Sequence, residues 1–137
     1  MFKFGKKSLE KLVTCDIFLQ QVATEAIRTC PVDFGIAEGH RSLEDQKKYY
    51  DEGLSKIDGI NLKSKHNYQP ARAFDFYCYV NGKSDYSKEA MCFVAAWILC
   101  TAKQMGINIR WGGNWDEDGE IITDQTFVDT PHIELKT

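Results

Sequence analysis

The chain has 137 residues, the length of one ordinary domain, and we expect residues 1–137 to fold as a single domain. Its 43% hydrophobic and 27% charged residues are typical of a globular protein and exclude a disordered or fibrous chain. The net charge of -3 argues against a nucleic-acid partner, because proteins that bind nucleic acids usually carry a basic surplus.

Two helices and a strand are predicted in the first half of the chain. Apolar residues recur with helical spacing over 16–30, where Asp16 is a suitable N-cap. A short strand is expected over 33–38. Ser42, followed three residues later by an aspartate, indicates the start of a second helix over 42–52.

The second half begins with a loop and an aromatic strand. Residues 53–70 have the glycines, serines and proline of a loop, and the run over 73–80 indicates a strand. A serine cap and a closing glycine bound a helix over 87–106. This helix is apolar on almost all sides, so we expect it to lie buried at the centre of the domain. Its apolar stretch is too short to cross a bilayer, so we expect no membrane insertion.

Two further strands, over 107–111 and 132–135, flank a turn rich in glycine and acidic residues. Taken together, the predicted elements indicate a small α+β domain.

The five cysteines indicate the compartment in which the chain folds. Their number is odd and no Cys-x-x-Cys pair occurs, so we expect free thiols that pack as small hydrophobic groups. This pattern is typical of a protein made in a reducing cytosol. The basic start of the chain is not followed by an apolar segment, so we expect no signal peptide. The cysteines are Cys15, Cys30, Cys78, Cys92 and Cys100.

Three residues have the chemistry of a metal centre: His66 in the loop, Asp75 in the aromatic strand and His132 in the last strand. Two imidazoles and a carboxylate leave a fourth position open for water, which suits a catalytic zinc ion. Asp75 stands between two phenylalanines, where a carboxylate is costly to bury unless it is paired or bound to metal. Alternation places Cys78 on the opposite face, which argues against it as a ligand. Spacing alone also allows two ordinary histidines without metal.

The order of these residues resembles a known family. Ser64-x-His66, Asp75 and Asp129-x-x-His132-x-Glu134 are similar to motifs of the zinc peptidases that share the lysostaphin, D-Ala-D-Ala carboxypeptidase and hedgehog-like fold. Within that group, the chain most resembles the L-alanyl-D-glutamate peptidases that tailed phages use as endolysins. Two further segments carry the resemblance: Gly39-His40-Arg41-Ser42 with Gln46, Tyr49 and Gly53, and Trp111-Gly112-Gly113-Asn114-Trp115. The resemblance implies a hedgehog/D,D-peptidase-like zinc peptidase fold, with a small antiparallel sheet packed with helices.

The resemblance also implies the chemistry of the site. His66, Asp75 and His132 would hold one zinc ion, which activates water toward a peptide carbonyl. The aspartate follows the first histidine by nine residues, where the family usually has seven with a glycine between them. Gln69-Pro70 stands in place of that glycine. We interpret this difference as a loop insertion that leaves the ligands unchanged.

Three acids compete for the role of general base, which passes a proton from water to the leaving amine. Asp129 matches the family's base, three residues before His132. Strand alternation favours Glu134 instead, and Asp124 lies in the preceding segment. We predict Asp129 because Pro131 lets the chain bend before the strand, and we expect Glu134 to orient a ligand.

Arg41, Gln46 and Ser64 are expected to bind substrate. A guanidinium can bind a carboxylate through two parallel hydrogen bonds, and D-glutamate in the wall peptide offers one. Gln46 would add a polar contact, and Ser64 would either bind substrate or steady the loop of His66. Without the family resemblance, an ordinary surface salt bridge is the simpler role for Arg41.

One turn resembles the start of a calcium loop. Asn114, Asp116 and Asp118 alternate as oxygen ligands before Gly119. The twelfth position of such a loop is Gln125 rather than the glutamate of an EF-hand. A regulatory calcium site and a solvated acidic turn are therefore both open.

These features predict a zinc-dependent endolysin that hydrolyses the L-alanyl-D-glutamate bond of peptidoglycan stem peptides and lyses the host cell. We expect a monomer that accumulates in the host cytoplasm and reaches the wall with the help of another factor. Two alternatives use the same fold: a zinc D,D-carboxypeptidase or dipeptidase, and a non-catalytic binding module stabilised by zinc.

Overall fold

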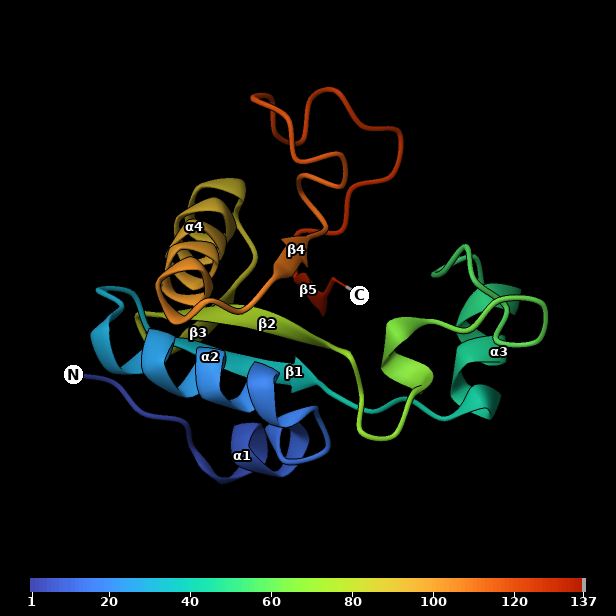
Figure 1. The fold of residues 1–137 in the computed structure, drawn as a ribbon, viewed down its shortest axis with the longest axis horizontal. Coiled ribbons are helices and arrows are strands. Elements are labelled where there is room, and N and C mark those ends of the chain that lie inside the picture. The colour runs from blue at the N-terminus through green and yellow to red at the C-terminus, as the bar shows by residue number, and fades with distance from the viewer. Residues whose placement is uncertain (137) are drawn as a thin grey trace.

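The computed structural model describes residues 1–136; Thr137, the last residue of the predicted domain, lies outside the described residues. The helices are α1 (Lys6–Leu12), α2 (Ile17–Thr29), α3 (Leu43–Asp51), α4 (Lys88–Met105) and the short 3-10 helix η1 (Lys65–Asn67). The strands are β1 (Phe34–Glu38), β2 (Ala73–Val80), β3 (Lys83–Asp85), β4 (Ile109–Trp111) and β5 (His132–Leu135). Figure 1 shows their arrangement.

The strands form one antiparallel sheet in the order β1-β2-β5-β4, and β3 pairs with β2 as a short hairpin. β5 is the last strand along the described chain, yet it lies between β2 and β4. The predicted α+β class, with a small antiparallel sheet packed with helices, is confirmed.

The predicted helices begin at the predicted caps. A side-chain oxygen accepts a hydrogen bond from a backbone N–H in the first turn at Asp16, Ser42 and Ser87. Gly106 ends α4 in the left-handed conformation, with a φ of 72°. α1 was not predicted, because it has seven mostly polar residues of which only Ser8 and Leu12 are buried.

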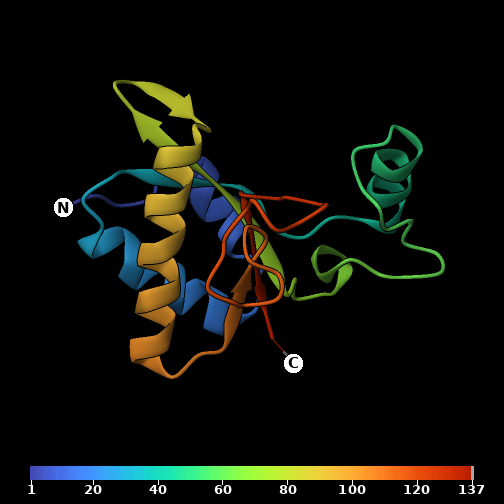
Figure 2. The same cartoon turned by 90° about the horizontal axis from the view of Figure 1, so that it is seen from above.

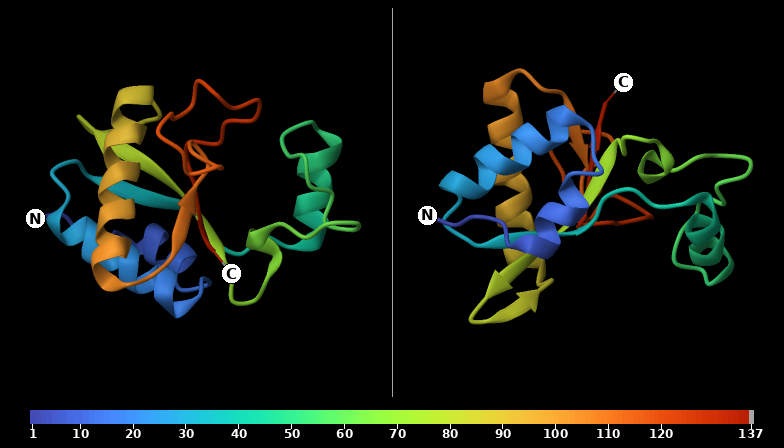
Figure 3. Two further views of the ribbon diagram at one scale, coloured as in Figure 1. Left: turned by 45° about the horizontal axis from the view of Figure 1, so that its top comes forward. Right: turned by 90° about the horizontal axis from the view of Figure 1, so that it is seen from below.

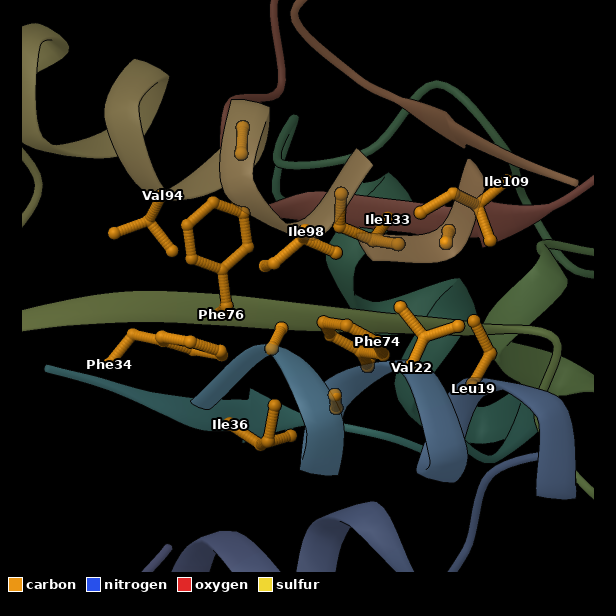
Figure 4. Packing of buried hydrophobic residues seen from close by; sticks show 14 of the residues in the cluster. Leu19, Val22, Phe34, Ile36, Phe74, Phe76, Val94, Ile98, Ile109 and Ile133 are labelled. Carbon is orange, nitrogen blue, oxygen red and sulfur yellow. The ribbon is translucent and has the colours of Figure 1, made fainter. Parts of the chain in front are cut away.

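α2 and α4 pack on the face of the sheet that carries Phe74, Phe76 and Cys78 (Figures 2 and 4). Burying each large apolar side chain there contributes roughly 1.5–3 kcal/mol relative to leaving it exposed. As predicted, alternation along β2 directs Asp75 and Tyr77 to the other face. Packing in the core therefore fixes the register of the strands. The register in turn sets the positions of the side chains on the opposite face. Core side chains labelled in Figure 4 include Leu19, Val22, Val94 and Ile98.

The prediction that α4 lies buried at the centre of the domain is wrong, because one side of the helix is exposed. Phe93 is 45% exposed and stacks on Trp97, with ring centroids 6.3 Å apart. The indole N–H of Trp97 donates to the hydroxyl of Thr29 on α2. Apolar side chains occupy both sides of α4, so the apolar pattern did not distinguish its packed side from its exposed one. None of the helices among residues 1–136 combines the length and the apolar character needed to cross a bilayer.

All five cysteines are free, as predicted, but they are not all buried. Cys15, Cys30 and Cys78 lie in the core, whereas Cys92 is half-buried and Cys100 is exposed. The expectation that every thiol packs as a small hydrophobic group is therefore wrong for Cys100, which lies on the exposed side of α4.

Two regions extend from the compact part of the fold. α3 and the loop that follows it form one projection, and the long connection from β4 to β5 forms the other (Figure 3). Residues from both regions line the same cleft.

Candidate metal centre

The three predicted metal ligands converge beside β2. Nε2 of His66 and Nδ1 of His132 lie 3.2 and 3.4 Å from Oδ1 of Asp75. The two imidazole rings meet edge to face, with centroids 5.1 Å apart. One ligand atom from each residue lies within 4.8 Å of the other two, so this group could hold a metal ion.

Each histidine uses its other ring nitrogen to fix its orientation. Nδ1 of His66 lies 2.7 Å from the carbonyl oxygen of Gly39, and Nε2 of His132 lies 2.9 Å from Oε1 of Glu134. Because both partners are acceptors, each imidazole carries a proton on that nitrogen, and the other nitrogen of each ring faces Asp75. Glu134, which was expected to orient a ligand, thus lies within hydrogen-bond distance of His132.

The unpredicted helix α1 helps to place the Gly39 carbonyl. A Cβ atom on Gly39 would overlap the carbonyl oxygen of Lys11 and the hydroxyl of Thr14. The turn after α1 therefore seats directly against Gly39, and only glycine fits that contact. A helix far from the cleft thus contributes to the orientation of His66.

The turn that carries His66 is capped from within. The hydroxyl of Ser64 accepts from the backbone N–H of His66, and the N–H of Ser64 donates to Oδ1 of Asn67. The inserted Gln69-Pro70 follows this turn, and His66 still meets Asp75. Of the two roles expected for Ser64, these contacts correspond to steadying the loop.

Burial and pairing shift the pKa values of the site residues in opposite directions. Burial would raise the pKa of Asp75, but hydrogen bonds from His132 and His66 hold it well below its usual value. Burial would lower the pKa of His132, whereas Asp75 and Glu134 raise it to about 9. Burial would raise the pKa of Glu134, but His132 and Arg110 lower it to about 2. At neutral pH, the metal-free site therefore holds an imidazolium between two carboxylates.

A cleft of about 520 Å³ opens over the three ligands, and Asp129 lines it. Oδ2 of Asp129 lies 4.0 Å from Nδ1 of His132. Burial and the nearby charge of Asp75 raise the pKa of Asp129. Glu134 also lines the cleft, but its oxygens are bonded to His132 and Arg110. Of these two carboxylates, Asp129 is the better placed to exchange a proton with a molecule in the cleft.

Two glycines make room for the chain around Asp129. A Cβ atom on Gly112 would overlap the carbonyl of Asp129, whose N–H donates to the carbonyl of Gly112 at 3.0 Å. A Cβ atom on Gly113 would overlap the ring of Trp111. The indole N–H of Trp111 donates to the carbonyl of Thr130. The tryptophan-glycine segment thus holds the backbone on both sides of the candidate base.

The guanidinium of Arg41 is held from three sides. It donates to both carboxylate oxygens of Glu38, at 2.9 and 2.6 Å, and to Oε1 of Gln46 at 2.7 Å. The ring of Tyr49 lies 4.7 Å from its central carbon. Gln46 is fully buried and does not line the cleft. It therefore holds Arg41, whereas a direct substrate contact was expected.

Neither Glu38 nor the aromatic wall of the cleft was predicted from the sequence. Trp115 stacks on Phe127, with centroids 6.4 Å apart, and its ring lies 5.4 Å from the ring of His132. Nζ of Lys56, in the loop after α3, lies 5.7 Å from the centre of the Phe127 ring. Trp115 was noted only as part of a motif, and no spacing rule links it to a phenylalanine twelve positions later.

In the acidic turn, Asp124 lies beside two of the predicted residues, Asp116 and Asp118. The carboxylates of Asp116, Asp118 and Asp124 come within 4.8 Å of one another, and all three are exposed. The side-chain amide nitrogen of Asn114 donates to the carbonyl of Asp118. Desolvation and the charges of Asp118 and Asp116 raise the pKa of Asp124. Asp124, which was considered as a base, belongs to this cluster.

The imidazole of His132 is expected to titrate near pH 9 in the metal-free protein, because Asp75 and Glu134 stabilise its charged form. Since this pKa exceeds the unfolded value of 6.5, the pairing stabilises the fold fully below about pH 6.5. The stabilisation is lost as the pH rises through about 9. NMR titration and thermal unfolding across this range measure both effects. Asp75→Asn should lower the pKa, and an imidazole that titrates below 6.5 in the unmutated protein would contradict the expectation.

Comparison with known proteins places the chain in a family. The model of the phage L-alanyl-D-glutamate peptidase family matches residues 1–136. The L-alanyl-D-glutamate peptidase of Escherichia phage T5 is 36% identical over 137 residues, which cover 98% of each chain. The crystal structure of the L-Ala D-Glu endopeptidase ChiX of Serratia marcescens gives a TM-score of 0.80 at 25% identity, over 98% of this chain and 90% of that one. The resemblance inferred from the motifs is thereby confirmed, and the chain belongs to the phage L-alanyl-D-glutamate peptidase family.

Proposed function

We propose that this protein is a zinc-dependent phage endolysin that hydrolyses the L-alanyl-D-glutamate bond of peptidoglycan stem peptides. The observation that carries the proposal is the convergence of His66, Asp75 and His132 on one point in the wall of a cleft. Family membership supports the reaction and the bond.

The donor set suits zinc. Two imidazole nitrogens and one carboxylate oxygen would hold the ion and would leave room for a water ligand, as a catalytic zinc site requires. The Gly39 carbonyl and the Glu134 carboxylate hold the rings as outer partners do in zinc centres. When bound, zinc polarises the peptide carbonyl and lowers the pKa of a bound water toward about 7.

Asp129 is the proposed general base. Its carboxylate accepts a proton from the attacking water and then donates it to the amine of the departing D-glutamate. The raised pKa of Asp129 favours proton uptake. Trp115 and Phe127 form an apolar wall of the same cleft.

Arg41 is the proposed partner for a substrate carboxylate. A glutamate inside a peptide uses one of its carboxyl groups for the onward bond and leaves the other free. A guanidinium has five N–H donors, and three of those of Arg41 donate to Glu38 and Gln46. The remaining two are available for the free carboxylate of D-glutamate.

We also propose that the enzyme is a monomer that accumulates in the host cytoplasm and reaches the wall through the action of another factor. The five free thiols are compatible with a reducing compartment.

Purified protein loaded with zinc is expected to release new amino groups on D-glutamate when it digests peptidoglycan. Chelation should abolish this release, and added zinc should restore it. Amino-terminal analysis of the digest is the measurement. Release of D-alanine instead would support the D,D-carboxypeptidase alternative, and zinc uptake with no new amino groups would support the binding module.

Asp129→Asn is expected to lower the rate of hydrolysis by roughly 10²–10⁴, because the amide cannot take up the proton. Bound zinc, measured by elemental analysis, should not change. Asp51→Asn, at an exposed carboxylate on α3, is the matched control and should keep full activity. Full activity of the Asp129 variant would refute the assignment of the base.

The acidic turn is a second candidate cation site, and we propose that calcium bound there regulates activity. A divalent cation would relieve the repulsion among Asp116, Asp118 and Asp124. Calcium added to zinc-loaded, calcium-free protein should change the rate of hydrolysis, and Asp118→Asn should abolish that response. An unmutated protein that does not respond to calcium would leave the acidic turn as a solvated turn.

A further inference from the structure

We propose that Glu38 is a positioning residue for the metal centre, which acts by holding Arg41 away from Asp75. This inference rests on the proposed zinc centre. Glu38 of β1 is in register with Asp75 of β2, and Asp75 is in register with His132 of β5. Glu38, Asp75 and His132 therefore form one row across the sheet, and all three line the cleft.

A bulge in β1 brings Glu38 into this row. Ile36 is buried in the core, and simple alternation would direct the residue two positions later to the core as well. The register shifts between Ile36 and Glu38, with one extra residue on β1. Such a bulge re-aims the next side chain, and Glu38 thereby reaches the face that carries Asp75.

The row places two carboxylates directly opposite each other, which is unfavourable unless a cation lies between them. Arg41 provides that cation. Its Nη2 lies 2.6 Å from Oε2 of Glu38 and 3.8 Å from Oδ2 of Asp75. The same nitrogen thus makes a short bond to Glu38 and only a long ion pair with Asp75.

Because Arg41 bonds to Glu38 and only forms a long ion pair with Asp75, the carboxylate of Asp75 stays available as a metal ligand. Oδ1 of Asp75 faces both histidines, and Oδ2 faces Arg41. If Glu38 lost its charge, Nη2 of Arg41 could bond directly to Oδ2. A direct charged hydrogen bond would withdraw electron density from the carboxylate and weaken it as a metal ligand.

The test is the dissociation constant for Zn2+, measured by competition with a chromogenic chelator, alongside kcat and KM. Glu38→Gln keeps an acceptor for Arg41 but removes the charge, and it should weaken zinc binding by about tenfold. Glu25→Gln is the matched control. Glu25 pairs with Arg28 at the same spacing of three residues, but both side chains are exposed and lie outside the cleft. The control should leave zinc binding and activity unchanged.

Two further variants separate position from charge. In an Arg41→Gln background, Glu38→Gln should change zinc affinity by no more than about twofold, because its effect passes through Arg41. Glu38→Asp keeps the charge but is too short for both bonds, so it should also weaken zinc binding. Thermal unfolding of the metal-free variants tests that they are folded, and the Asp variant gives a second measurement should the Gln variant unfold.

Wild-type zinc affinity in both Glu38 variants would overturn the inference. An equal loss of zinc affinity on Glu38→Gln with and without Arg41 would also overturn it, because the effect would not pass through Arg41. Wild-type zinc affinity in Glu38→Asp alone would overturn it as well, because the charge would then act without positioning. These outcomes differ from failure of the proposed function, in which the unmutated protein itself would bind no zinc.

Discussion

Asp75 is a carboxylate in the middle of a sheet. The arrangement of the residues around it follows from the free-energy cost of burying its charge. An isolated buried ion costs several kcal/mol, so the charge needs partners that are already in place when the fold forms. Strand register supplies His132, the capped turn supplies His66, and the segment after β1 supplies Arg41. The same partners that stabilise the metal-free carboxylate also define the point where a cation would sit.

The fold separates this chemistry from the packing that supports it. One face of the sheet is covered by α2 and α4, and its apolar side chains set the register. The other face carries charged groups, and each is held by a neighbouring residue. Gly39 holds His66, Glu134 holds His132, and Gln46 holds the arginine. The family motif around Arg41 therefore consists largely of residues that hold its guanidinium in place.

Sequence patterns predicted the larger elements because strong local signals mark them. Caps and periodicity located α2, α3 and α4, and aromatic alternation located β2 and the face of Asp75. α1 and β3 were missed because both are short and polar. Spacing alone left the metal centre open, and only the order of several motifs favoured it.

The details that could not be predicted depend on contacts between distant segments. Glu38 joins the site because of a bulge, and no local pattern in its sequence marks that irregularity. Phe127 meets Trp115 across a loop without regular structure. Asp124 lies beside Asp116 and Asp118 because the turn folds back on itself.

The position of β5 has a consequence for biosynthesis. β4 has its only described sheet partner in β5, which also brings His132 and Glu134. While the chain is still emerging from the ribosome, the helices and the β1–β2 pair can begin to pack, but the centre of the sheet stays open until residues 132–135 arrive. The nascent chain therefore cannot bring His66, Asp75 and His132 together before residues 132–135 have been made, and this hydrolase of the cell wall becomes competent only after that point.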